Sequence, residues 1–172
     1  MRRRRHDELK EEAGMDPVQK KNALRKLTYG LYIATARDAE SVAGGTINWL
    51  SQASFEPPLI MAGIKRDSRL HQAIENSRAF AVHVVGKSQK NMATTFFKGA
   101  EEASGKINGF GFVKGATGSP ILTDPPAWFE CRVLDAFHRG DHTIFVCEVV
   151  EAGMRSEEEP LTLREAGFNY AG

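Results

Sequence analysis

The chain has 172 residues, a length that suits one domain with a sizeable hydrophobic core. Its hydrophobic content of 41% and charged content of 26% are ordinary for a soluble globular protein. The net charge is only +1, but residues 1–26 carry nine Lys or Arg against five Asp or Glu, so the remainder is mildly acidic. That balance argues against nucleic-acid binding by the body, and no apolar run approaches the roughly 20 residues of a membrane span. We therefore expect a cytoplasmic protein that binds neither nucleic acid nor membranes.

Residues 1–21 are charged and show no sustained apolar face, so we predict a flexible basic tail. The run from Arg2 to Arg5 could contact RNA, a membrane or a partner, but a solvated terminus explains it more simply. Residues 22–172 are predicted to form a single domain.

The first half of this domain alternates strands and turns. Residues 31–36 are predicted to form a first strand, residues 41–45 a turn and residues 46–50 a second strand. Pro57 and Pro58 precede a third strand over residues 59–64. Asp67 or Ser68 then caps a helix that runs to about Ser77.

The second half continues the β pattern. Residues 80–85 alternate as a strand with one buried face, and Ser88 begins a helix that carries Met92 and Phe96 inward. Residues 98–118 contain six glycines and are expected to form a long loop. Strands are predicted over residues 128–136 and 143–150, joined by a hairpin at residues 138–142. Six short strands with two inserted helices indicate a mainly β fold, an antiparallel barrel.

The stretch from Gly45 to Pro58 is unusually polar for a strand. Five hydroxyl or amide side chains lie within nine residues: Thr46, Asn48, Ser51, Gln52 and Ser54. A core strand has no need of them, whereas the edge of a ligand pocket does, because buried donors and acceptors on a ligand must be matched. We therefore expect a wall of a binding site here.

A second candidate feature is the basic start of the predicted helix. Lys65, Arg66 and Arg69 lie where helix N–H groups are unsatisfied and the helix dipole favours an anion. The segment predicts a phosphate site, although a solvated surface turn would have the same composition.

The tripeptide Gly140-Asp141-His142 begins the last strand. The hairpin turn explains the glycine and the aspartate, and His142 is placed either against a ligand or in solvent. The sequence contains no nucleophile elbow, P-loop or convincing carboxylate pair, so in an enzyme a bound cofactor would supply the reactive atoms. Cys131 and Cys147 lack paired spacing and are expected to be buried free thiols, with no metal site.

Taken in order, these motifs resemble the flavin reductase-like family, whose fold is the FMN-binding split barrel. The resemblance covers residues 22–172 and rests on residues 29–35, 46–58, 80–84, 118–122, 140–142 and Tyr170. It is nearest to the branch associated with flavodiiron proteins and rubredoxins. The resemblance implies a Greek-key antiparallel split β-barrel with a few short helices, and a homodimer with FMN near the subunit interface.

The resemblance also implies roles for individual residues. The flavin ring and ribityl chain would be bordered by Thr46, Asn48, Trp49, Ser51, Gln52, Ala53 and Ser54. The phosphate side would be formed by Lys65, Arg66, Ser68, Phe97 and Lys98. His142 matches the family histidine that lies near the flavin and the nicotinamide, and is the expected catalytic residue.

The implied function is an NAD(P)H-dependent flavin reductase that passes electrons to flavin or to a diffusible acceptor, such as an oxygenase, a rubredoxin or a flavodiiron protein. FMN is favoured over FAD because no site for an adenine half is visible. The alternative is a non-catalytic FMN-binding electron-transfer module that uses the same pocket but excludes the nicotinamide.

Overall fold

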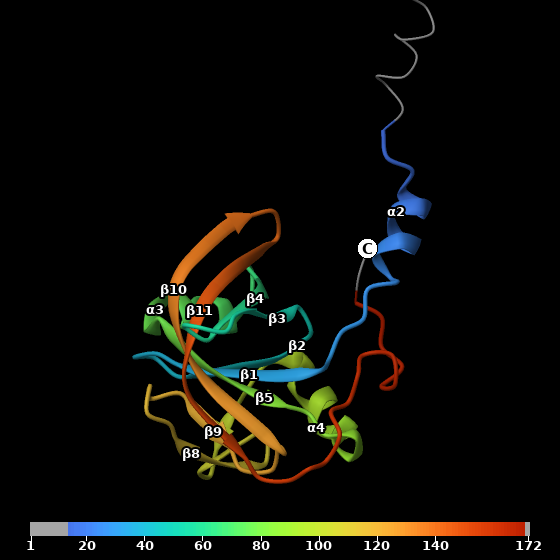
Figure 1. Cartoon of the computed structure of the whole chain (residues 1–172). Coiled ribbons are helices and arrows are strands. Elements are labelled where there is room, and N and C mark those ends of the chain that lie inside the picture. The colour runs from blue at the N-terminus through green and yellow to red at the C-terminus, as the bar shows by residue number, and fades with distance from the viewer. Residues whose placement is uncertain (1–13, 171–172) are drawn as a thin grey trace, which may run out of the picture.

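The structure is a computed structural model that describes residues 14–170. Its main sheet has seven antiparallel strands in the order β2-β1-β5-β10-β11-β4-β3 (Figure 1). The bounds are β1 (Tyr32–Arg37), β2 (Val42–Ile47), β3 (Leu50–Ser54), β4 (Leu59–Lys65), β5 (Ala79–Val84), β10 (Ala127–Arg139) and β11 (His142–Met154). The mainly β, antiparallel fold class is thus confirmed.

A smaller sheet fills the segment that was expected to be one long loop. Its strands are β6 (Glu102–Ala103), β7 (Lys106–Ile107), β8 (Phe110–Lys114) and β9 (Pro120–Leu122). The loop prediction was wrong because glycines here serve tight turns between short strands. Gly105 and Gly109 have φ values of 71° and 86°, which side-chain-bearing residues rarely adopt.

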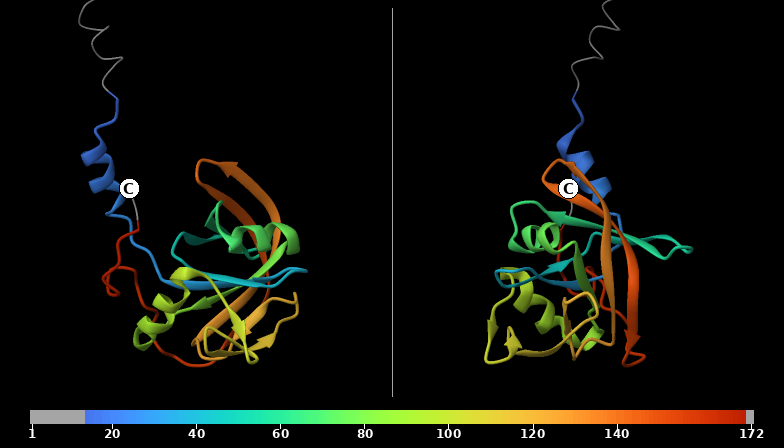
Figure 2. Two further views of the ribbon diagram at one scale, coloured as in Figure 1. Left: turned by 180° about the vertical axis from the view of Figure 1, so that it is seen from behind. Right: turned by 90° about the vertical axis from the view of Figure 1, so that its left-hand side faces the viewer.

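The helices are few and short, as predicted. They are α2 (Pro17–Leu24), α3 (Arg69–Ser77) and α4 (Lys90–Thr95), with 3-10 turns η1 (Lys87–Gln89) and η2 (Phe96–Lys98). Figure 2 shows α3 and α4 packed against the sheets, whereas α2 stands away from the body. No helix among residues 14–170 has the length and apolar character needed to cross a membrane.

The helix α2 lies partly inside the segment that we predicted to be a flexible tail. The Asp16 carboxylate caps it by accepting the Val18 N–H at 2.9 Å, and Pro17 occupies its first turn. None of its residues is buried. The Arg run at residues 2–5 lies outside the described residues.

Two strand boundaries differ from the sequence prediction. The turn lies at Asp38–Ser41, where the Asp38 carboxylate accepts two backbone N–H groups, so β2 begins at Val42. The strand expected over residues 46–50 is interrupted, since β2 ends at Ile47 and β3 starts at Leu50. Asn48 and Trp49 occupy the break, and Asn48 lines the pocket described below.

Two hydrophobic clusters lie on opposite sides of β1 and β5. One is enclosed by the curled main sheet and α3 and contains Phe80, Val82 and Phe145. The other is covered by α4, the small sheet and the C-terminal segment, and contains Ile33 and Phe96. Consequently β5 is buried on both faces, not on one as predicted.

His83 of β5 is fully buried and joins the two sheets. Its Nδ1 lies 2.9 Å from the Ile33 carbonyl oxygen, and its Nε2 accepts the Leu122 N–H at 3.0 Å. A carbonyl oxygen can only accept, so Nδ1 carries the proton and the ring is neutral. Burial also lowers the pKa of His83 to about 4.

The helix α3 and the β10–β11 hairpin match their predictions and frame the functional site. The Ser68 hydroxyl caps α3 by accepting the His71 N–H at 3.1 Å, while Leu70, Ala73 and Ile74 are buried. The hairpin turns at Gly140, whose φ is 70°. Cys131 and Cys147 are buried free thiols, as expected.

Candidate active site

A pocket of about 920 Å³ opens where the C-terminal segment passes the main sheet. Its lining comes from β2, from the end of β4, from the start of α3, from η2 and from residues 163–170. Seven predicted site residues line it: Thr46, Asn48, Lys65, Ser68, Phe97, Lys98 and His142. Residues that are far apart in the chain are therefore brought to one cavity.

One end of the pocket is positively charged. Lys65 ends β4, and its Nζ lies 3.1 Å from the Asp67 carboxylate, which raises the pKa of Lys65 through a hydrogen bond. Ser68 and the first turn of α3 lie beside it, so the helix dipole adds to the positive potential. This arrangement can accept a phosphate group.

Arg69 also lines this end, although its guanidinium is already paired. It donates two hydrogen bonds to the Asp38 carboxylate, at 2.6 and 2.9 Å. The Arg69 contact holds the pKa of Asp38 well below its usual range. Arg69 therefore fixes the start of α3 against the β1–β2 turn and contributes its charge from there.

His142 and Tyr170 form a second wall of the pocket, and the Trp49 ring packs against both from outside the lining. The rings of Trp49 and His142 have centroids 4.3 Å apart, and those of Trp49 and Tyr170 are 5.6 Å apart. The Tyr170 hydroxyl lies 3.1 Å from His142 Nε2, and the Asp141 carboxylate lies 2.9 Å from His142 Nδ1. The hydrogen bond from His142 is the main reason that the pKa of Asp141 is lowered.

These contacts fix the orientation of the His142 ring. The Asp141 carboxylate can only accept, so Nδ1 donates to it, and Nε2 forms a second hydrogen bond with the Tyr170 hydroxyl. His142 is only 9% exposed, which makes its orientation well defined. It is the buried imidazole of the pocket.

Trp49 does not line the cavity itself but stands directly behind His142. Its indole N–H is buried and has no acceptor among residues 14–170. Gly63 makes room for this ring, because a Cβ at Gly63 would lie 3.1 Å from the Trp49 ring. A buried N–H without a partner is rare in folded proteins, and an external acceptor would satisfy it.

Besides Trp49, five predicted residues lie outside the pocket lining. Ser51, Gln52, Ala53 and Ser54 are on β3, where Ser51 Oγ bonds the Gln52 carbonyl and Gln52 Nε2 bonds the Ser54 carbonyl. Arg66 points to the hairpin, where its Nη1 lies 3.3 Å from the Gly140 carbonyl. Their proposed flavin contacts remain predictions.

The C-terminal segment contributes pocket residues that the sequence reasoning did not assign. Phe168 packs edge-on against Phe97, with centroids 5.0 Å apart, and the Tyr170 carbonyl lies 3.4 Å from Asn48 Nδ2. Leu163, Gly167 and Asn169 complete this side. The only signal in the sequence was Tyr170 as the last of the ordered motifs.

Comparisons with known proteins agree with this geometry. The FMN reductase (NADH) of Agrobacterium fabrum is 31% identical over 151 residues, which cover 86% of this chain and 82% of that protein. The high molecular weight rubredoxin of Moorella thermoacetica is 30% identical over 143 residues, 81% of this chain and 62% of that protein. A relative from Rhizobium meliloti is 30% identical, and the chain spans only 42% of its length.

Solved structures share the fold. The styrene monooxygenase flavin reductase from Pseudomonas putida S12 superposes with a TM-score of 0.70 at 30% identity, covering 86% of this chain and 91% of that one. The family profile described as flavin reductase like domain matches residues 24–172. Because this match spans most of the chain, the protein belongs to the flavin reductase-like family.

Proposed function

We propose that this protein is an NAD(P)H-dependent flavin reductase that binds FMN in the pocket beside His142. The observation that carries the proposal is the joining, in one cavity, of an anion-binding helix start with a wall of polar and aromatic side chains. Relatives whose names give NADH-dependent flavin reduction support the same reading.

The residues present fit FMN. The pocket volume lies within the range of about 300–1,000 Å³ that ligand sites occupy. The start of α3 with Lys65 matches a phosphate. Thr46 offers less than the sequence indicated, because its hydroxyl already donates to the Ala93 carbonyl at 2.6 Å.

Bound FMN supplies a ring that accepts hydride from a reduced nicotinamide. The chain's own residues orient and enclose the reactants. Asp141 and Tyr170 hold the His142 ring in one orientation, and residues 167–170 of the C-terminal segment form one side of the pocket. Asn48 and Ser68 contribute polar groups at the rim, and Phe97 and Lys98 close the side next to Phe168.

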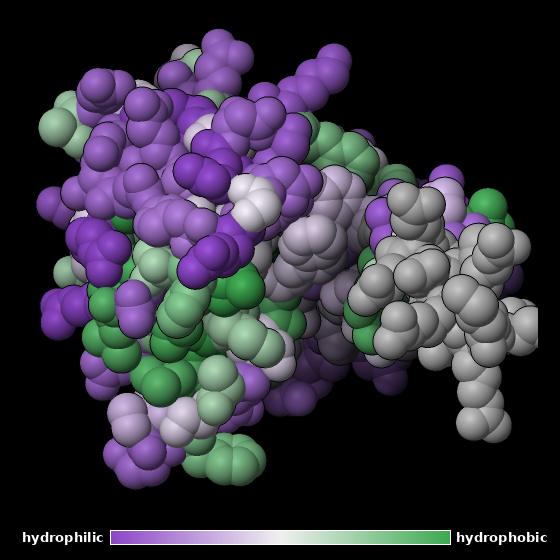
Figure 3. Space-filling model, turned by 90° about the horizontal axis from the view of Figure 1, so that it is seen from above, coloured by the Kyte–Doolittle hydropathy of each residue, from purple (hydrophilic) through white to green (hydrophobic). Residues whose placement is uncertain are grey.

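We further propose a homodimer formed through the outer face of β4, β10 and β11. Phe137 and Ile144 are directly paired across the hairpin and are 56% and 46% exposed, and Met61 of β4 is 44% exposed. In Figure 3, hydrophobic side chains gather toward one edge of the face seen from above, beside a hydrophilic area. Burial of such a face in a dimer removes apolar surface from water.

Light scattering after size-exclusion chromatography tests the dimer. Ile144→Glu should give a monomer, because it places a charge in the middle of the interface. Val113→Glu is the matched control, since Val113 is 55% exposed on β8 and should leave the dimer intact. A parent protein that elutes as a monomer would exclude this assembly.

The electron acceptor is proposed to be a separate cytoplasmic component. Relatives and neighbours include reductase components of oxygenases and a rubredoxin-type protein, so an oxygenase, a rubredoxin or a flavodiiron protein is the expected class. Free flavin is the simplest acceptor of the same electrons.

Anaerobic mixing of the FMN-loaded protein with NADH or NADPH tests the function. The visible absorbance of the bound flavin should be lost on the time scale of one catalytic turnover. If the absorbance is lost with dithionite but not with NADH or NADPH, the protein is instead a non-catalytic electron-transfer module. FMN titrations test the phosphate site separately. They compare Lys65→Ala, in the pocket, with the control Lys106→Ala, which changes an exposed lysine outside the pocket.

A further inference from the structure

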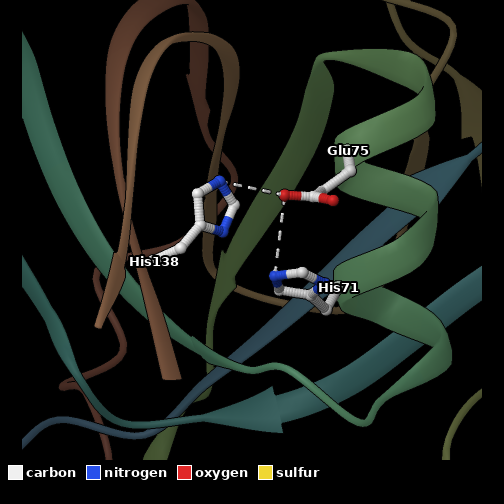
Figure 4. Close-up of side chains that lie close together, drawn as sticks. All are labelled: His71, Glu75 and His138. Atoms are coloured by element: carbon white, nitrogen blue, oxygen red, sulfur yellow. Dashed lines mark ion pairs between the residues drawn. The ribbon is translucent and has the colours of Figure 1, made fainter. Parts of the chain in front are cut away.

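A cluster of metal-ligating side chains lies outside the pocket, between α3 and the hairpin. It consists of His71 and Glu75, four residues apart on α3, and His138 near the end of β10. Figure 4 shows that the two rings and the carboxylate point toward one another from these two elements. The ligand atoms all lie within 4.8 Å of one another.

The distances within the cluster differ from those of ordinary hydrogen bonds. One Glu75 carboxylate oxygen lies 3.8 Å from His71 Nε2 and 3.5 Å from His138 Nε2. An N–H···O bond is about 2.7–3.2 Å long, so the carboxylate is directly bonded to neither ring. Ligand atoms about 2.0–2.2 Å from a tetrahedral metal ion stand roughly 3.3 Å apart, somewhat closer than the two distances from Glu75, so the site contracts when it binds an ion.

The surrounding hydrogen bonds prepare the rings for a metal. The fully buried Thr143 hydroxyl lies 3.2 Å from His138 Nδ1 and 2.7 Å from His71 Nε2. When Nδ1 of His138 donates to Thr143, its Nε2 keeps a lone pair toward Glu75, which is the orienting contact typical of metal-bound histidines. The His71 Nε2 atom points to the same place, between the Thr143 hydroxyl and the Glu75 carboxylate.

We propose that His71, Glu75 and His138 bind a divalent transition-metal ion of the Zn²⁺ class. Two imidazoles and one carboxylate suit such ions, whereas Mg²⁺ prefers a shell of oxygen ligands. His71 gives up its hydrogen bond to Thr143 when it binds the ion, and Thr143 keeps His138 as a partner. The half-exposed His138 ring turns inward to close the site.

The site would connect two elements that also build the pocket. The helix α3 carries Ser68 at its cap, and β11, which carries His142, is the hairpin partner of β10. An ion held between α3 and β10 would fix the position of the helix start relative to the hairpin. The proposal does not depend on the proposed reductase activity, because it concerns residues outside the pocket lining.

Calorimetric titration of the full chain loaded with FMN tests this site. The protein is first treated with a chelator and desalted, and ZnCl₂ or MgCl₂ is added in a non-chelating buffer, with free FMN titrated as a reference. We expect one Zn²⁺ per chain and no heat from Mg²⁺. Glu75→Gln and His138→Gln should each weaken Zn²⁺ binding by at least about tenfold, since even the loss of outer contacts weakens metal sites by about 10–100-fold.

The matched control is His6→Gln, because it removes a histidine that lies outside the described residues. It should leave the Zn²⁺ affinity unchanged. Both test variants change partly exposed side chains, and circular dichroism verifies that they fold. Equal affinities for the parent, Glu75→Gln and His138→Gln would overturn the proposal, as would the absence of one-to-one binding to the parent.

Discussion

The neutral His83 ring makes the stability of this fold sensitive to mild acid. Both ring nitrogens are engaged, and the Nε2 lone pair accepts the Leu122 N–H at 3.0 Å. Protonation at Nε2 would place two donors against each other inside a fully buried site. In the unfolded chain the ring has a pKa of about 6.5, whereas burial lowers the folded value to about 4.

The sign and size of the effect follow from proton linkage. Because the folded pKa is depressed, the contribution of His83 to stability is fully present above pH 6.5 and is lost as the pH falls through 4. Between pH 8 and pH 5 the loss is about 2 kcal/mol, and the slope approaches about 1.4 kcal/mol per pH unit. This is a large part of the stability of a typical domain.

Urea unfolding at several pH values between 8 and 5 measures this loss. His83→Gln is the informative variant, because an amide can supply one donor and one acceptor but does not titrate in this range. This variant should be less stable than the parent at pH 8. Between pH 8 and pH 5 its free energy of unfolding should fall by about 2 kcal/mol less than that of the parent. Identical pH slopes for the two proteins would refute the assignment of a neutral buried His83.

Three further predictions concern the pocket and its support. Glu130→Ala should lower the free energy of unfolding by about 3 kcal/mol in urea titrations, because the buried carboxylate accepts the N–H groups of Ala116 and Thr117. The control is Glu151→Ala at the exposed cross-strand neighbour, which should change the free energy of unfolding little. Ser68→Ala should lower the free energy of unfolding by about 1 kcal/mol and weaken FMN binding, measured by fluorescence quenching. The control Asp16→Ala removes the cap of the exposed α2 and should not affect FMN binding. Equal FMN affinities of the two variants would argue against the phosphate site at α3. Gly63→Val should weaken FMN binding, because a Cβ at position 63 would lie 3.1 Å from the Trp49 ring. Gly14→Ala is the control, because a Cβ at position 14 would meet no atom within 4 Å. If both variants bind FMN alike, Trp49 has no part in the site.

Local signals in the sequence were sufficient for the elements that frame the pocket. Ser68 before an apolar pattern predicted the start of α3, and Gly140 between two alternating segments predicted the hairpin. The basic residues beside Ser68 also indicated an anion site. In each case the relevant contacts lie within a few residues, so the sequence pattern contains them.

Contacts between distant segments were not predictable in the same way. Tyr170 lies next to His142 and Asn48 only because residues 161–163 pair with Tyr29, Leu31 and Val85, which places the segment after them at the pocket. The strand over residues 80–85 was expected to have one buried face, and only the second sheet, which His83 contacts through Leu122, reveals that both faces are buried. Residues 51–54, which we expected to border the flavin, lie on β3 outside the lining of the pocket, so their flavin contacts stay a prediction.

The polar character of β3 has a further consequence for the solution behaviour of the protein. β3 forms one edge of the seven-stranded sheet, and an exposed edge can pair with a strand of another molecule. Ser51, Gln52 and Ser54 offer little apolar surface, Gln52 bonds its own strand, and a register shift between Gln52 and Ser54 disturbs the regular ladder. These polar side chains thus also make β3 a poor edge for pairing with a strand of another molecule.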